Sequence, residues 1–123
     1  MKAPVLIGLA IAALAIAAPA SAQQAELGYP RGALGFEALA SDDLATAELQ
    51  LKSGAVPRYD PARLINIGQV YARTGRLEQA ERMFVRAQRA EEVELVLADG
   101  RTVSSAEVAE RALQLLRAGY YRR

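Results

Sequence analysis

The chain has 123 residues, a formal net charge of +1, and neither histidine nor cysteine. Without these residues there is no Cys–His or Ser–His nucleophile pair, and zinc or copper would lack their usual ligands. We therefore expect a protein that is not an enzyme, with no catalytic residues, no cofactor and no metal site. The length suits one domain, which apolar packing must hold together because no disulfide can form.

The N-terminal segment, 1–22, has the pattern of a secretory signal peptide. A positive start at Lys2 precedes an uncharged apolar run at 3–18, and Ala20 and Ala22 are the small residues of an A-x-A cleavage site. The run is shorter than the roughly 20 residues that cross a bilayer. We therefore expect cleavage after Ala22 and a periplasmic or secreted protein with no stable membrane anchor.

The expected mature chain, 23–123, is electrically neutral. Of the 15 basic residues only Lys2 is lost with the signal peptide, so 14 basic residues face 14 acidic ones. A neutral domain argues against nucleic acid or acidic lipid as the main partner.

The mature chain also matches a shifted copy of itself, mainly at small and apolar positions. The matched pairs are Leu34-Gly35 with Ile67-Gly68, Leu44 with Leu77, Ala47 with Ala80, and Leu51 with Phe84. Matches at packing positions indicate two copies of one helical unit, at about 28–60 and about 61–94. Coincidence between alanine-rich helices is the alternative.

In chain order, each copy predicts two helices. The first copy predicts helices over 30–40 and 44–53, with a turn between them and a linker at 54–59. In the second copy, Asp60 is an N-cap and Pro61 takes the first helical position, which predicts a helix over 61–73. Apolar residues at three- and four-residue steps predict its partner over 77–90, whose charged side suits a solvated face.

The pattern changes after Glu92. Branched apolar residues at 93–97 favour a strand, and Asp99-Gly100 is a strong turn signal, so we expect a β-hairpin over about 93–103. Ser104 with Glu107 forms a capping box that opens a last helix over about 104–118.

The second copy, 61–94, resembles a tetratricopeptide repeat (TPR). The residues that match the family pattern are Leu64, Ile67-Gly68, Tyr71, Gly75, Ala80, Phe84 and Ala87, all in register. Leu64 stands where the family most often has tryptophan, Glu92 where it has a closing proline, and Ala38 replaces the tyrosine in the first copy. The whole chain is similar to small exported proteins of this type found in alphaproteobacteria. The resemblance implies a mostly α fold of TPR-like antiparallel helix pairs, two repeats with the first degenerate, closed by the β-hairpin and a C-terminal capping helix.

The resemblance also implies a binding surface along the first helix of each repeat. Carried over by position, the candidate residues are Ile65, Asn66, Gln69 and Arg73 in the second copy and Tyr29 and Phe36 in the first. The polar stripe would suit a carboxylate or a peptide backbone, or it is an ordinary solvated stripe. The apolar stripe either holds a ligand's side chains or packs on the protein's own N-terminal segment.

We therefore expect an exported, non-catalytic protein–protein or peptide interaction module that acts as an adaptor or scaffold. The alternative is a structural subunit that forms a homodimer through its first helix pair.

Overall fold

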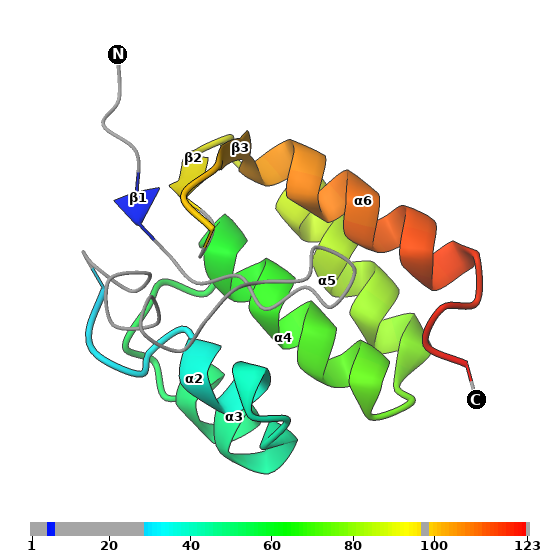
Figure 1. Cartoon of the computed structure of the whole chain (residues 1–123), viewed down its shortest axis with the longest axis horizontal. Helices are drawn as coiled ribbons and strands as arrows, with labels where there is room; N and C mark the ends of the chain where they lie inside the picture. Colours follow the sequence, from blue (N-terminus) through cyan, green and yellow to red (C-terminus); the bar gives the residue numbers. More distant parts are fainter. Residues whose placement is uncertain (1–4, 7–28, 97–98, 123) are drawn as a thin grey trace.

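A computed structural model describes residues 5–6, 29–96 and 99–122 of the chain. This part is mostly helical with a small antiparallel hairpin, as the sequence predicts. Its elements are β1 (Val5–Leu6), α2 (Phe36–Ala40), α3 (Leu44–Leu51), α4 (Pro61–Arg73), α5 (Leu77–Arg89), β2 (Glu94–Val96), β3 (Thr102–Ser104) and α6 (Ser105–Arg117). In Figure 1, α4 lies in the middle, with α2 and α3 on one side and α5 and α6 on the other.

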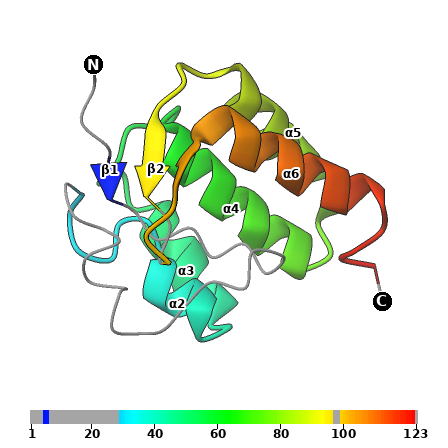
Figure 2. The ribbon, with the colours of Figure 1, turned by 45° about the horizontal axis from the view of Figure 1, so that its top comes forward.

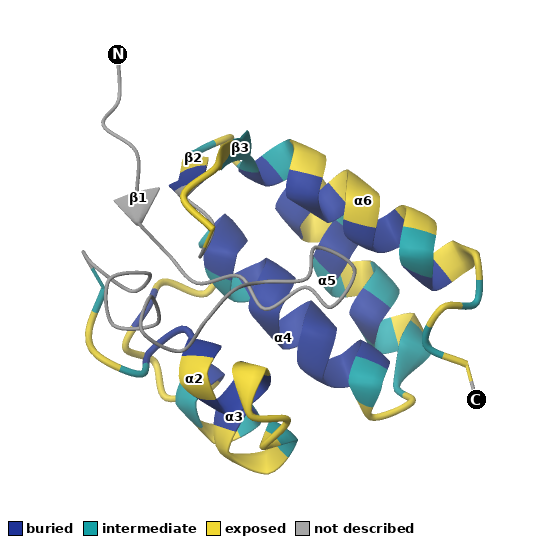
Figure 3. Ribbon diagram, viewed as in Figure 1, coloured by how far each residue is buried: buried dark blue, intermediate teal, exposed yellow. Residues whose placement is uncertain are grey.

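Helix α4 is the centre of the fold. It begins where the sequence predicts, because the Asp60 carboxylate accepts hydrogen bonds from the N–H groups of Ala62 (2.9 Å) and Arg63 (3.2 Å). Every residue from Pro61 to Ala72 except Arg63 is buried. A helix that is buried almost all round needs many neighbours, and helices α2 and α3 on one side and α5 and α6 on the other supply part of them (Figure 3).

The described part of the chain contains two helix pairs, α2 with α3 and α4 with α5, and in each pair a glycine makes close contact with the second helix. A Cβ atom on Gly68 of α4 would overlap the fully buried ring of Phe84 in α5. In the first pair, a Cβ atom on Gly35, just before α2, would lie 3.3 Å from the Ala47 carbonyl oxygen in α3. The glycine in each pair therefore sets how closely its helices approach.

The turns inside the two helix pairs share one hydrogen-bond pattern. The Arg76 N–H donates to the Tyr71 carbonyl at 2.8 Å, and in the first pair the Asp43 N–H donates to the Ala38 carbonyl at the same distance. A left-handed residue precedes each donor: Gly75 (φ 81°) and Asp42 (φ 59°). These are Schellman-type ends, which satisfy helix carbonyls that otherwise lack partners.

The helix predicted over 30–40 is wrong in its first half, since α2 begins only at Phe36. Gly32 (φ 78°) and Gly35 (φ 64°) both take left-handed backbone conformations, which no right-handed helix can contain. The chain instead makes turns there, with the Ala33 N–H donating to the Pro30 carbonyl at 2.9 Å.

The hairpin and the last helix form as predicted. Strands β2 and β3 pair antiparallel with Leu95 opposite Val103, and the Ser104 hydroxyl caps α6 by accepting from the N–H groups of Ala106 (3.1 Å) and Glu107 (3.4 Å). Strand β1 lies beside β2 in parallel pairing, which the sequence does not predict (Figure 2). Helix α6 ends like the first helices of the two pairs, because the Tyr120 N–H donates to the Leu115 carbonyl at 3.0 Å.

In the part of the chain that the structure describes, the buried apolar side chains form two clusters. One joins α2 and α3 to α4, α5 and α6, and includes Phe36, Leu51 and Phe84. The other joins the start of α4 to the hairpin and α6, and includes Leu64, Ile65 and Leu95.

The signal peptide and its cleavage after Ala22 lie outside the described residues, apart from the two residues of β1. Among the helices of the described part, none combines the length and the apolar character that a membrane crossing requires.

Candidate functional site

Two of the polar candidate residues on α4 bind the backbone around α2. The Asn66 amide donates through Nδ2 to the Leu34 carbonyl oxygen at 2.9 Å, and Arg73 donates through Nη1 to the Leu39 carbonyl oxygen at 2.9 Å. Asn66 is fully buried and Arg73 is half-buried. These side chains therefore cross-link the two helix pairs, and they do not form the ordinary solvated stripe considered from the sequence.

Gln69 lies between them along the helix and is also fully buried. Its Oε1 atom accepts a hydrogen bond from the Tyr121 hydroxyl at 3.1 Å, whereas its Nε2 atom has no hydrogen-bond partner in the described structure. Burial raises the pKa of the Tyr121 hydroxyl, so this group remains a donor at neutral pH. Gln69 therefore keeps an amide NH2 group that is shielded from water and makes no hydrogen bond in the described structure.

The structure does not bring the apolar candidates together in one stripe. In the first copy, Phe36 is buried in one core cluster, whereas Tyr29 packs against the other cluster, which contains Ile65 of the second copy. Tyr29 is half-buried, and its hydroxyl donates to Asp60 Oδ2 at 3.0 Å. Burial, and after it the charge of Asp60, raises the pKa of the Tyr29 hydroxyl. Each of these three side chains has a structural role.

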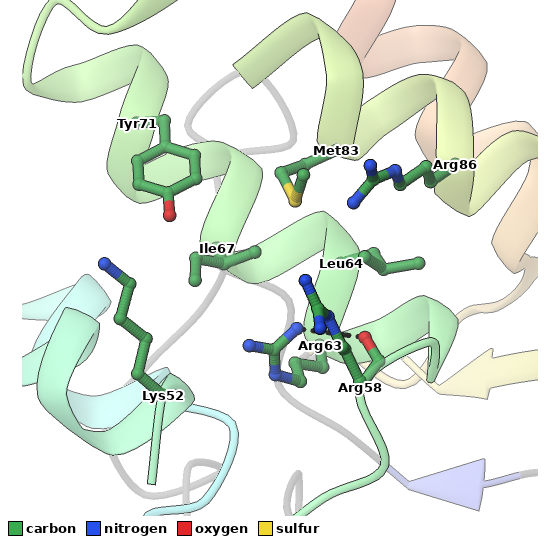
Figure 4. Close-up of a pocket in the computed structure, with 8 residues that line it drawn as sticks. All are labelled: Lys52, Arg58, Arg63, Leu64, Ile67, Tyr71, Met83 and Arg86. Atoms are coloured by element: carbon green, nitrogen blue, oxygen red, sulfur yellow. Dashed lines mark hydrogen bonds between the residues drawn. The ribbon is translucent and has the colours of Figure 1, made fainter. Parts of the chain in front are cut away.

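A cavity of about 250 Å³ lies on a different side of α4, next to α3 and α5. We call it the arginine pocket. Of the lining residues that the structure describes, half are apolar or aromatic and half are cationic. The lining residues are Lys52, Arg58, Arg63, Leu64, Ile67, Tyr71, Met83 and Arg86. Figure 4 shows Lys52 at one end beside Tyr71 and the three arginines toward the other end.

Two hydrogen bonds to backbone carbonyl oxygens orient the Arg63 side chain at this pocket. Its Nε atom donates to the Leu51 carbonyl oxygen at 2.8 Å and its Nη1 atom to the Arg58 carbonyl oxygen at 3.0 Å. Burial lowers the pKa of Arg63; Tyr71 and Asp60 oppose this, whereas the positive charge of Arg58 adds to it. Arg58 and Arg86 are exposed and have no ion pair within the described part of the chain.

Among the described residues, the carboxylates of Glu48 and Asp60 contact lining residues, and both are already engaged. Glu48 accepts from Lys52 Nζ at 2.6 Å and from both Nη atoms of Arg76, at 2.5 and 3.1 Å. The hydrogen bonds from Arg76, followed by that from Lys52, lower the pKa of Glu48 to about 2. Asp60 caps α4 and accepts from Tyr29. Neither carboxylate therefore compensates the positive charges of Arg58 and Arg86.

Sequence reasoning did not find the arginine pocket. Its cations come from the end of α3, the linker, α4 and α5, so no spacing along the chain relates them. The sequence places Arg86 on a solvated face, and it is exposed, but it also faces this cavity. The excess of arginine over lysine was the one available signal, because arginine is the residue that binds oxyanions bidentately.

Among the described residues, no group of three or more acidic side chains is placed to hold a metal ion. Comparison of the chain with protein-family models, with curated protein sequences and with solved structures gives no match. Function is therefore inferred from two places on α4: the polar residues Asn66, Gln69 and Arg73, and the arginine pocket.

Proposed function

We propose that this chain is an exported, non-catalytic module of TPR-like repeats that binds an extended segment of a protein or peptide along α4. The observation that carries the proposal is the buried Nε2 donor of Gln69, which has no hydrogen-bond partner in the described structure. An unsatisfied buried donor costs about 1–3 kcal/mol. A carbonyl of a bound peptide backbone would remove that cost, so the amide favours a ligand with this chemistry. Because Gln69 is fully buried, the peptide has to displace the side chains that now shield the amide.

The repeat assignment is supported by equivalent contacts at matching positions of the two copies. Gly35 and Gly68 each touch the second helix of their own pair, and the turns at Asp43 and Arg76 make the same hydrogen bond. A shared contact and a shared turn are what two copies of one unit would produce. Helix α6 ends with the same type of turn as α2 and α4, which supports α6 as the first helix of a third, incomplete unit that closes the array.

The polar residues on either side of Gln69 are already engaged within the protein. Asn66 and Arg73 are oriented by the carbonyl oxygens of Leu34 and Leu39. Substituting either one would loosen the first helix pair as well as any binding site. Gln69 accepts a hydrogen bond from Tyr121 through Oε1, but its Nε2 atom makes none in the described structure. A substitution at Gln69 therefore tests binding through Nε2, and thermal unfolding of the variant checks that it still folds.

The test compares Gln69→Leu with Gln88→Leu, a matched change at an exposed position of α5. Protein purified after export is used to select peptides from a random displayed library, and the selected peptide is titrated calorimetrically against each variant. Loss of one buried amide hydrogen bond should weaken binding by about fivefold to tenfold for Gln69→Leu. Gln88→Leu should bind like the parent chain. Equal affinity of both variants, or the failure to select any peptide, would contradict the proposal.

A homodimer is the second candidate, and one observation favours it. Leu49 on α3 is 75% exposed, in the first helix pair, which the sequence predicts as the dimer contact. Sedimentation velocity should then show a dimer that Leu49→Glu converts to a monomer. A parent chain that sediments as a monomer at all tested concentrations would exclude this candidate.

A further inference from the structure

We propose that the arginine pocket is a second binding site, independent of the α4 peptide site, and that its ligand is a phosphate-type oxyanion. This group can come from free inorganic phosphate or from a phosphomonoester on a lipid head group, and both present negatively charged phosphate oxygens. The site lies away from Asn66, Gln69 and Arg73, so neither proposal depends on the other.

The charge around the cavity is the first reason. Of the eight lining residues that the structure describes, none is acidic and four are cationic. The chain as a whole is nearly neutral, so this excess is local and arises from the folding of distant segments together. Cations that face a common cavity repel one another, and a multiply charged anion between them converts that repulsion into attraction.

The donor geometry is the second reason. Arg63 uses Nε and Nη1 to bind the carbonyl oxygens of Leu51 and Arg58, so its guanidinium plane is set before a ligand arrives. Arg58 and Arg86 are exposed, and their guanidinium groups lie around the same space in Figure 4. Arg63 therefore offers donors whose orientation is already set, and the exposed Arg58 and Arg86 offer donors that can move toward a ligand. Together the three guanidinium groups can donate charge-assisted hydrogen bonds to one anion.

The number of cations in the pocket favours a phosphate over a carboxylate. A carboxylate carries one negative charge and two oxygens, whereas a phosphomonoester carries about −1.5 to −2 at neutral pH and three acceptor oxygens. The second kind fits the three guanidinium groups better, since the Lys52 ammonium is already paired with Glu48. The cavity of about 250 Å³ has room for a phosphate group with a small apolar substituent against Leu64, Ile67 and Met83.

The experiment uses two double variants with the same change in net charge. Arg58→Gln with Arg86→Gln removes the two adjustable donors of the pocket. Arg89→Gln with Arg111→Gln changes two exposed arginines on α5 and α6 that do not line it. All four positions are exposed, so both variants should fold, and circular dichroism with thermal unfolding checks this.

Inorganic phosphate and glutarate are titrated calorimetrically, and vesicles of phosphatidylcholine with or without phosphatidic acid are tested by co-sedimentation. The parent chain should bind phosphate, vesicles containing phosphatidic acid, or both, and the probe that binds identifies the source. The pocket variant should bind that probe about tenfold more weakly for each guanidinium removed, and the control variant should bind it like the parent chain.

Three results would overturn the proposal. The first is that neither phosphate nor the phosphatidic acid vesicles bind to the parent chain. The second is equal weakening in the two double variants, since general surface charge would then explain binding. The third is that glutarate binds as tightly as phosphate, which would assign the pocket to carboxylates.

Discussion

Replacing Gly68 by alanine sets two opposing effects against each other. In an ordinary helix interior, glycine to alanine stabilises by about 1 kcal/mol, because alanine loses less backbone entropy. Here the new Cβ atom would overlap the Phe84 ring, with Cδ1 at 2.7 Å and Cζ at 3.0 Å. Overpacking of this kind costs about 1–3 kcal/mol, and the severity of the overlap points to the upper end. We therefore expect a net loss of about 2 kcal/mol, from the difference of the two effects.

Thermal and urea unfolding followed by circular dichroism measure this loss. For a domain of this size, 1 kcal/mol corresponds to about 4–8 °C, so Gly68→Ala should lower the midpoint by roughly 10 °C. Phe84→Leu removes the ring, so in the double variant the alanine should cost much less than it does alone. The coupling between the two substitutions should exceed about 1 kcal/mol.

A higher unfolding midpoint for Gly68→Ala, or strict additivity with Phe84→Leu, would refute this account of α4–α5 packing. Either result would mean that the two helices separate freely to admit a methyl group. The same spacing positions Leu64, Ile67 and Met83 in the arginine pocket, so the pocket would then have no rigid floor.

Three further predictions concern single groups. The pKa of Glu48 is about 2 against an ordinary value of 4.5, so its contribution to stability is present above pH 4.5 and is lost as the pH falls toward 2. Allowing for solvent screening, acid titration of unfolding should show a loss of about 1–2 kcal/mol that Glu48→Gln removes. Asn66→Ala should cost about 1–3 kcal/mol in urea unfolding because the Leu34 carbonyl oxygen loses its donor, and an unchanged midpoint would contradict this role. Ser104→Ala should cost about 1 kcal/mol in the same assay through loss of the α6 cap, whereas Ser104→Thr, whose hydroxyl can also donate to Glu92, should retain most of it.

Local signals in the sequence were sufficient for most of the helix boundaries. Asp60 with Pro61, and Ser104 before α6, act on backbone N–H groups two or three residues away. Such interactions are complete within one helical turn, so they form in the same way whatever the rest of the chain does. The hairpin was predictable for the same reason, because its turn joins strands that are adjacent in the sequence.

The first copy shows where local reasoning failed. The internal match placed Gly35 opposite Gly68 correctly as a packing position, and both glycines do touch the next helix. The match could not show that Gly35 is left-handed whereas Gly68 is helical. Glycine allows both conformations, so only its neighbours in space decide between them.

The sequence by itself determined the helical class, the hairpin, the caps, and the absence of the residue types that nucleophile pairs and zinc sites use. Only the tertiary structure decided which side chains are available for binding. Asn66 and Arg73 are engaged by the distant carbonyl oxygens of Leu34 and Leu39, and the arginine pocket gathers cations from positions 52, 58, 63 and 86. The physical reason is that side-chain hydrogen bonding and local electric potential depend on distances in space, which no periodicity in the chain encodes.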